Sequence, residues 1–402
     1  MTAMTTGVAA GRPQPQTTNE APGGPFIRHS QPGRRSQYAT SGVAFAGLIN
    51  QPLVAAPGYT RAYRILNQAT GGNGATVTTT ADSPFNLYSL IQLKDAFGTP
   101  LIVAPGFEAL NLVPMFSGQY GTDENINVLA IGETFTVNGA STGNSTWSSV
   151  LPLEFAKAYG VISSANASLL PTLQFNLNTA AGYYGTTVPG TLLTWAVTVD
   201  QDFYWLPEGV AVEPPGIGTT CQWIYQPANP TIGSAATLNV QAPRLGGYLS
   251  TIVAELRDSA GARTSNAWGT AANNGWGSRI RMLVDGVPIV DSLLTTILED
   301  MSIAWPGYGT ATGATGGTTQ SAGTVEVAQV GGVLAFTRKN GLSQRVQGLF
   351  DTGETYLSTN PGTQLEFACA PWGGVTSGPA TLNLLCGQVV PSGALIQGLP
   401  EV

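Results

Sequence analysis

The feature that most constrains this chain is a segment that occurs twice. Residues 90–102 read LIQLKDAFGTPLI and residues 280–290 read IRMLVDGVPIV, so an apolar run, an Asp, a Gly, a Pro and two aliphatic residues recur in the same order. Gly98 aligns with Gly286, which sets the offset between the copies at 188. The Asp and Gly favour a tight turn, and the Pro suits the start of a strand, where its missing N–H costs least. Each copy therefore predicts a strand, a turn and a second strand.

Flanking segments support the repeat. Residues 57–59 (PGY) before the run RAYRIL match residues 243–248 (PRLGGY) before LSTIVAEL, at an offset near 189. Farther on, residues 171–177 (PTLQFNL) match residues 379–385 (PATLNLL) at an offset of 208. A run of Gly, Thr, Ala and Ser at residues 307–324 accounts for nearly all of that increase, because insertions in surface loops cost little. The sequence predicts two tandem domains that superpose strand for strand.

Most of both domains has the pattern of β-structure. Short alternating or aromatic-rich apolar segments, separated by Gly, Asn, Asp and Pro, predict strands through residues 53–207 and 219–391. Residues 38–50 favour a short helix with a capping Thr or Ser. Residues 151–160 favour another, because a Pro follows the first residue and a Gly ends the segment. Residues 291–301 suit a helix and a strand equally.

Charged residues are scarce and unevenly placed. They make up 10% of the chain, against roughly 25% in ordinary soluble proteins. Such a surface is typical of an extracellular β-protein, or of a protein that buries much surface against copies of itself, since interface cores are depleted of charge. The segment 1–64 holds six Arg, no Lys and one Glu, whereas the whole chain has a net charge of −7. This basic arm predicts contact with lipid headgroups, nucleic acid or a neighbouring subunit; a solubilising tail is the alternative.

The residues offer little material for catalysis or metal binding. His29 is the only histidine and lies in the arm, so a Ser-His-Asp or Cys-His arrangement within a domain is not expected. Cys221, Cys369 and Cys386 are odd in number and far apart, and match neither a disulfide framework nor a metal motif. None of the three lysines follows a Gly, so there is no phosphate-binding loop. We expect a protein that is not an enzyme and has no cofactor.

One carboxylate pair stays open to two interpretations. Asp200 and Asp202 would share one face of a strand, where they could hold Ca²⁺ or serve acid–base chemistry. The alternative is a solvated strand end. At the N-terminus no basic segment precedes a long apolar run, so no signal peptide is expected. No uncharged apolar run approaches the roughly 18 residues of a membrane-spanning helix.

Two tandem β-domains, a basic arm, low charge and no catalytic set together resemble one family, the double jelly-roll major capsid proteins of tailless, membrane-containing, tectivirus-like bacterial viruses. The resemblance rests on SPFNLYSLIQLKDAFGTPLI, on VLPLEFAKAYGVI with the later PTLQFNLN, and on their second copies, and covers roughly residues 38–395. It implies an all-β chain with two tandem eight-stranded jelly rolls. The expected order is a short extended or helical N-terminal arm (1–52), jelly roll 1 (53–207), a linker (208–218), jelly roll 2 (219–391) and a C-terminal tail (392–402).

The resemblance also implies a function. Three chains would form a pseudo-hexagonal homotrimer, and these capsomers would tile an icosahedral shell around an internal membrane. The expected partners are neighbouring capsomers, minor capsid or penton proteins and possible lipid, without sequence-specific nucleic acid. The protein would assemble in the host cytoplasm and reside in the virion. The arm would face inward, and the residues expected to touch the membrane or adjacent trimers are Arg28, Arg34, Arg35, Tyr38 and Phe45.

Two other protein classes fit parts of the pattern. A secreted carbohydrate-binding or carbohydrate-processing β-sandwich should carry a signal peptide, which is not expected from the N-terminal pattern. A phage tail or spike component would be rich in Gly and Thr and trimeric, but should show repeats shorter than the one that joins Gly98 to Gly286. Particle form separates the three classes: a shell, a monomer or a rod.

Overall fold

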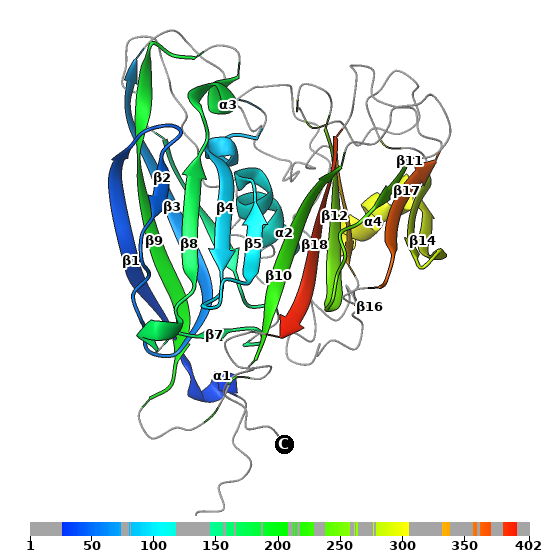
Figure 1. The fold of residues 1–402 in the computed structure, drawn as a ribbon, viewed down its shortest axis with the longest axis horizontal. Helices are drawn as coiled ribbons and strands as arrows, with labels where there is room; N and C mark the ends of the chain where they lie inside the picture. Colours follow the sequence, from blue (N-terminus) through cyan, green and yellow to red (C-terminus); the bar gives the residue numbers. More distant parts are fainter. Residues whose placement is uncertain are drawn as a thin grey trace, which may run out of the picture.

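The computed structural model places two β-sandwiches side by side along the long axis of the molecule (Figure 1). The residues it describes are 26–73, 80, 82–117, 145–155, 158–164, 166–185, 188–207, 212, 214, 218–228, 238–257, 261, 263, 276, 279–304, 332–337, 357–359, 362–370 and 381–391. We call the sandwich built from strands β1 to β9 roll 1, and the one built from β10 to β18 roll 2.

Roll 1 has the strand order of a jelly roll. Its strands are β1 (Gln31–Val43), β2 (Leu48–Asn50), β3 (Tyr59–Asn73), β4 (Tyr88–Lys94), β5 (Pro100–Ala104), β6 (Ser145–Pro152), β7 (Ile162–Ser163), β8 (Thr172–Leu177) and β9 (Thr191–Trp205). One sheet has the order β1-β9-β3-β6 with β7 on β3, and the facing one the order β2-β8-β4-β5. The helical segments are α1 (Phe26–His29), η1 (Phe85–Leu87), η2 (Glu108–Leu112), α2 (Val113–Phe116), η4 (Ala167–Leu169) and α3 (Ala180–Tyr184).

Roll 2 repeats this topology strand for strand. Its strands are β10 (Thr219–Ala228), β11 (Leu238–Gln241), β12 (Tyr248–Arg257), β13 (Arg279–Val284), β14 (Val287–Leu293), β15 (Val333–Thr337), β16 (Leu357–Ser358), β17 (Leu365–Ala370) and β18 (Thr381–Pro391). The order β10-β18-β12-β15, with β16 on β12, matches β1-β9-β3-β6 with β7 on β3; the order β11-β17-β13-β14 matches β2-β8-β4-β5. Helix α4 (Leu294–Ala304) follows β14 as η2 and α2 follow β5.

The repeated segment is the hairpin between the fourth and fifth strands of each roll. Gly98 and Gly286 have φ of 84° and 79°, a left-handed conformation that glycine adopts without steric cost. Pro100 is the first residue of β5, and Pro288 is the second residue of β14. The two jelly rolls that the sequence predicts are therefore present, and the sequence repeat joins equivalent turns.

One of the flanking matches pairs the wrong strands. Residues 171–177 lead into β8, whereas residues 379–385 lead into β18, the counterpart of β9. The true counterpart of β8 is β17. The two segments look alike because both are alternating strands that follow a Pro, and that pattern does not encode a place in the roll. The run at 307–324 lies outside the described residues.

Two of the expected helices are also wrong. Residues 38–50 contain the end of β1, a turn and β2. β1 pairs with β9 from Gln31↔Trp205 to Val43↔Trp195, and this pairing overrides a weak helical propensity interrupted by two glycines. Residues 151–160 begin as the end of β6, which pairs with β3. Residues 291–301 combine both interpretations, since β14 ends at Leu293 and α4 begins at Leu294.

The N-terminal arm is shorter than the sequence predicts. Because β1 and β2 belong to the sheets of roll 1, the part of the chain before the roll ends at Ser30, instead of at residue 52. Residues 1–25 and the expected tail, 392–402, lie outside the described residues, as does most of the expected linker, 208–218.

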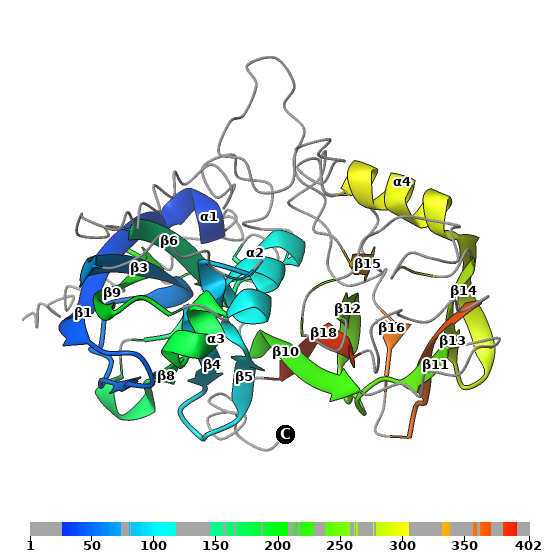
Figure 2. The ribbon, with the colours of Figure 1, turned by 90° about the horizontal axis from the view of Figure 1, so that it is seen from above.

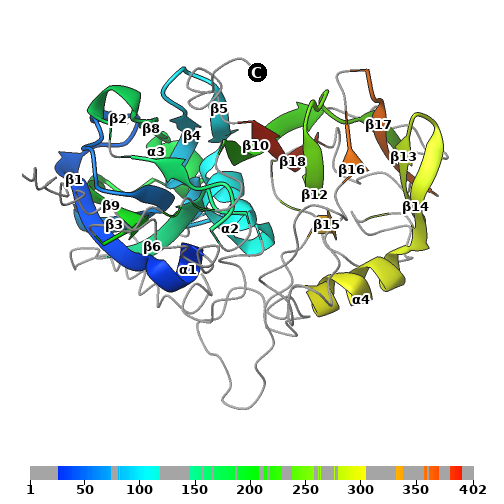
Figure 3. The ribbon, with the colours of Figure 1, turned by 90° about the horizontal axis from the view of Figure 1, so that it is seen from below.

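The two rolls share one sheet, which the sequence did not predict. β5 of roll 1 pairs in parallel with β10 of roll 2, with Ile102 opposite Trp223 and Val103 opposite Ile224. The sheet β2-β8-β4-β5 thereby continues into β10-β18-β12-β15. Figures 2 and 3 show β5 and β10 next to each other at the centre of the molecule. One apolar core cluster includes residues of both rolls.

Candidate functional site

Charged side chains are buried where the two rolls meet. Glu255 and Arg257 lie on β12 of roll 2, whereas Asp82 and Glu108 belong to roll 1. Glu108 and Glu255 are 3% and 1% exposed. Burial of charge is expensive unless the groups are paired. In a chain with so few charges, this junction cluster is a distinctive feature.

Arg257 is the centre of the junction cluster. Its guanidinium forms ion pairs with Asp82 and, at 2.7 Å, with Glu255, and it lies 3.5 Å from the carboxyl of Glu108. Arg263 donates from Nε to Asp82 Oδ1 at 2.7 Å. Charges from roll 2 therefore neutralise carboxylates from roll 1, and the ion pairs tie the rolls together.

The protonation of Glu108 completes the charge balance. Burial, and next the neighbouring Glu255, raise the pKa of Glu108 well above its ordinary value. Asn383 donates from Nδ2 to Glu255 Oε2 at 2.9 Å. When Glu108 carries a proton, the two remaining carboxylates of the cluster face two guanidinium groups. The buried charge then sums to zero, which is the least costly state for groups shielded from water.

A cavity of about 660 Å³ lies beside the cluster. Its lining includes Asp82, Glu108 and Arg257, with Tyr88, Phe107, Tyr225 and Asn383. The guanidinium carbons of Arg257 and Arg263 lie 5.5 and 4.6 Å from the centroid of the Phe107 ring, at distances typical of cation–π contacts. In the part of the chain that the structure describes, no three His, Cys, Asp or Glu side chains are grouped so as to hold a metal ion.

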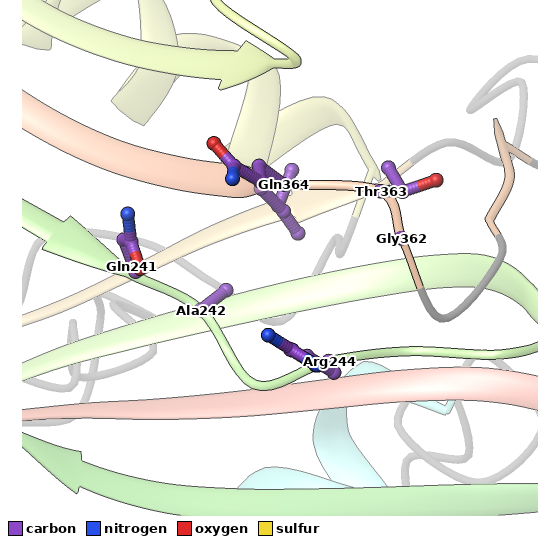
Figure 4. Close-up of a pocket in the computed structure, with 7 residues that line it drawn as sticks. Gln241, Ala242, Arg244, Gly362, Thr363 and Gln364 are labelled. Atoms are coloured by element: carbon purple, nitrogen blue, oxygen red, sulfur yellow. The ribbon is translucent and has the colours of Figure 1, made fainter.

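A smaller cavity, of about 140 Å³, lies between the end of β11 and the start of β17. Gln241, Arg244, Thr363 and Gln364 are among its lining residues. Figure 4 shows the side chains of Gln364 and Thr363 pointing away from each other, and no set of polar groups converging on one point. This geometry favours no particular ligand.

The apolar part of the junction centres on Trp223. Its side chain is 2% exposed, and Gly387 lies directly opposite it on β18. A Cβ at Gly387 would lie 2.9 Å from atoms of the Trp223 ring, closer than real contacts allow. Gln222 donates from Nε2 to the carbonyl of Pro100 at 2.6 Å. The junction therefore combines a packed ring, a short parallel ladder and buried ion pairs.

The open carboxylate pair is resolved for Asp202. Its Oδ1 accepts from Arg34 Nε at 2.7 Å and its Oδ2 from Arg64 Nε at 2.5 Å. Asp202 is 6% exposed, so it is not a solvated strand end. Both of its oxygens face guanidinium groups, an arrangement that does not favour Ca²⁺.

The three arginines expected at the membrane lie near the start of β1. Arg28 is exposed on α1 and Arg34 is paired with Asp202. Arg35 is exposed and donates from Nη1 to the carbonyl of Ala55 at 2.7 Å. Helix α1 is anchored below roll 1 by Phe26, which is 3% exposed and packs edge-on against two tyrosine rings.

The two aromatic residues expected there are partly buried against the core. Tyr38 is half-buried against it. Phe45 packs against Tyr183 and Tyr184 of α3 and against Trp195. Figure 1 shows α3 and α1 at opposite ends of roll 1. The five expected contact residues therefore do not form one surface.

Sequence reasoning missed the junction cluster. A signal was present: β12 reads YLSTIVAELR, with an acid and a base two residues apart in an otherwise apolar strand. Charged residues on one face of a buried strand need partners, but the sequence does not reveal that the partners lie in the other roll. None of the described helices is long and apolar enough to cross a membrane.

The comparisons with known proteins agree with the topology. No protein-family model and no curated protein matches the sequence. The STIV MCP structure aligns with a TM-score of 0.57 at 10% identity, covering 92% of this chain and all of that one. An atomic structure of Sulfolobus Turreted Icosahedral Virus gives 0.57 at 12% identity, with 92% and 94% covered. The capsid of the virus PBCV-1 gives 0.56 at 11%, with 90% and 93% covered. The chain has the double jelly-roll fold of these viral capsid proteins.

Proposed function

We propose that this chain is a major capsid protein whose trimers tile an icosahedral viral shell. The observation that carries the proposal is the double jelly-roll fold, shared over 92% of this chain with the full length of the STIV MCP. The scarcity of charge supports it, because a subunit that buries its flanks against neighbours has few charges in the interface cores. The shared sheet supports it as well, since it fixes two rolls as one rigid building block.

The finer parts of the proposal concern location and partners. The protein acts as a structural component of the virion, without catalysis, after assembly in the host cytoplasm. Its partners are neighbouring copies and the minor capsid or penton proteins that complete a shell. The shell encloses a lipid membrane. These parts follow from the resemblance to membrane-containing viruses and from the basic charge near the N-terminus.

We propose that the start of roll 1 is the membrane-facing end. Arg28 and Arg35 are exposed there, and planar guanidinium groups suit phosphate headgroups. Arg34 is half-exposed but holds Asp202, so its contribution to lipid binding is smaller. Tyr38 and Phe45 are partly buried against the core, so we expect their contribution to be smaller than that of the exposed arginines.

The assembly experiment uses the purified full-length chain. Light scattering at micromolar concentration should give the mass of a trimer, and negative-stain electron microscopy should show hexagonal particles or shells. Because a stable interface buries more than about 1,000 Å², the trimer should persist on dilution. A monomer, rods, or binding to a carbohydrate column would each contradict the proposal.

The membrane experiment measures flotation with anionic vesicles at low and high salt. The variant R28Q should bind less than the wild type, because an arginine near such a surface contributes about 1 kcal/mol that weakens with salt. The matched control R279Q removes the same charge from an exposed position on roll 2 and leaves Arg281 paired with Asp291. Equal flotation of all three proteins would contradict the membrane assignment. Deleting residues 1–37 is unsuitable, because the cut falls within β1.

A further inference from the structure

The two rolls of one chain are joined through one strand of each roll. The equivalent strand of the other roll lies, in both cases, at the edge of a described sheet, with no strand paired on its outer side. β5 of roll 1 pairs with β10 of roll 2. The counterpart of β5 in roll 2 is β14, and the counterpart of β10 in roll 1 is β1. Each ends its sheet. Figures 1 and 2 show β1 at one end of the long axis and β14 at the other.

Matching irregularities fix the register of the third strands. In roll 1 Arg61 is a bulge in the pairing of β3 with β9. In roll 2 Ser250 is a bulge in the pairing of β12 with β18. The offset between Arg61 and Ser250 agrees with the offset near 189 at which residues 57–59 match residues 243–248. Bulges are local features of a strand pair, so their agreement aligns the rolls residue by residue.

That alignment assigns counterparts on the first strands. The residue after the bulge is Ala62 in roll 1, where it pairs with Asp202, and Thr251 in roll 2, where it pairs with Gly387. On the other side, Asp202 pairs with Arg34 and Gly387 pairs with Trp223. Arg34 is therefore the counterpart of Trp223. One step along, Arg35 is the counterpart of Ile224.

The fifth strands carry a matching irregularity of their own. Leu101 is a bulge in the pairing of β5 with β4, and Ile289 is a bulge in the pairing of β14 with β13. The offset between them equals that between Gly98 and Gly286. Val290 is thus the counterpart of Ile102, and Asp291 the counterpart of Val103.

We propose that β14 of one copy lies parallel to β1 of the next copy, as β5 lies against β10 within a chain. The inferred register places Val290 opposite Arg34 and Asp291 opposite Arg35. The inference rests on the proposed function and specifies its subunit contact. A head-to-tail contact of this kind closes into a ring when the rotation per copy permits, and three copies would then present six rolls joined by equivalent strand pairs.

The chemistry of the two edges supports this occupant. β14 exposes Val287 and Leu293 by 63% and 49%, and β1 is a long edge strand. Such an edge invites association unless it is covered. Asp291 pairs with Arg279 and Arg281 of its own chain, and Arg35 of the next copy would lie opposite it as a further positive charge. At the equivalent positions the junction within the chain has Trp223 and Ile224. The inferred contact between chains is therefore more polar, which suits subunits that fold before they associate.

The test is a disulfide across the inferred pair. Cα atoms of neighbouring strands lie within the range that a disulfide spans. The double variant R35C/D291C should form covalently closed trimers on a non-reducing gel after mild oxidation. Mixing the single variants R35C and D291C should give covalent dimers and no larger species. The native cysteines are buried, and burial raises the pKa of Cys386 to about 12, so they should not contribute.

The control pairs the same β14 position with a distant edge. Leu48 on β2 is 60% exposed at the far end of the shared sheet. L48C/D291C should therefore form no covalent dimers or trimers on the non-reducing gel. If R35C/D291C does not fold, as judged by its thermal melt, R34C/V290C tests the neighbouring pair. A trimer by light scattering without either cross-link overturns this contact and leaves the proposed function intact. A monomer without cross-links overturns both.

Discussion

Arg257 in the second roll forms an ion pair with Asp82 in the first, although the two residues lie far apart in the chain. The two side chains are 13% and 14% exposed, so water screens the pair poorly. Glu255, two positions before Arg257, belongs to the same cluster. The angle between the rolls is therefore set by directional, charge-assisted contacts as well as by the shared sheet and by apolar packing, which is not directional.

Replacing Arg257 should destabilise the protein strongly. R257M keeps an apolar stem but leaves the buried carboxylates without their central cation, and breaking a buried pair in this way costs about 3–5 kcal/mol. The free energy of unfolding, measured in urea, should fall by that amount. R279M is the matched control: Arg279 pairs with Asp291 at the surface, where ion pairs contribute little. Equal unfolding midpoints for both variants would contradict a structural role of the cluster.

The raised pKa of Glu108 predicts a pH dependence with a definite sign. In the unfolded chain the carboxyl loses its proton near its ordinary pKa of 4.5, whereas burial and Glu255 hold the proton on in the folded protein. Stability from this group is complete below pH 4.5 and is lost as the pH rises toward the folded-state pKa. E108Q imitates the protonated form, so its melting temperature should exceed that of the wild type by a margin that grows with pH.

The measurement is a series of thermal melts from mildly acidic to mildly alkaline pH. E366Q is the matched control, because Glu366 is half-buried on β17 and its Oε2 accepts from Asn239. E366Q replaces a carboxylate outside the junction cluster, so its melting curves measure the general effect of a Glu-to-Gln change on stability. A constant difference between E108Q and the wild type across the series would show that Glu108 does not titrate differently in the folded state.

The fold could be predicted from the sequence where a local pattern has one structural solution. The turn at Gly98 and the turn at Gly286 each need a left-handed residue between two apolar strands, so their recurrence revealed the tandem plan. Alternating strands are less informative, which is why the match of residues 171–177 to residues 379–385 joined unlike strands. The helix expected over residues 38–50 failed for a related reason: pairing with β9, distant in sequence, decides the structure.

The junction could not be predicted because its contacts are long-range. Glu255 and Arg257 stand out in the apolar strand β12, but nothing in the sequence identifies Asp82 as their partner. Only the packing of one roll on the other brings Asp82 and Arg257 together. The arginines near the N-terminus illustrate the same limit. Their charge is visible in the sequence, but the strand that carries Arg34, and its pairing with Asp202, are not.

Adding a methyl group at Gly387 should loosen the junction between the rolls. The new Cβ of G387A would lie 2.9 Å from the buried ring of Trp223, and overpacking of this kind costs about 1–3 kcal/mol. The urea midpoint should fall accordingly. G190A is the matched control, because nothing lies within 4 Å of a Cβ at that position. If the two variants unfold at the same urea concentration, the ring is not confined as the structure indicates.

The carboxylate of Glu154 should prove essential to the lower end of roll 1. Its side chain is fully buried, and it accepts from Arg61 Nε at 2.8 Å, from the Ala158 backbone N–H at 2.5 Å and from the Tyr204 hydroxyl at 3.0 Å. E154A would remove the common acceptor of all three donors, and the loss of a buried carboxylate that accepts from a guanidinium costs about 3 kcal/mol. Urea unfolding measures the loss. The same truncation in E366A removes a half-exposed carboxylate and should have a much smaller effect. A free energy of unfolding for E154A within experimental error of E366A would mean that water or a rearranged Arg61 replaces the lost acceptor.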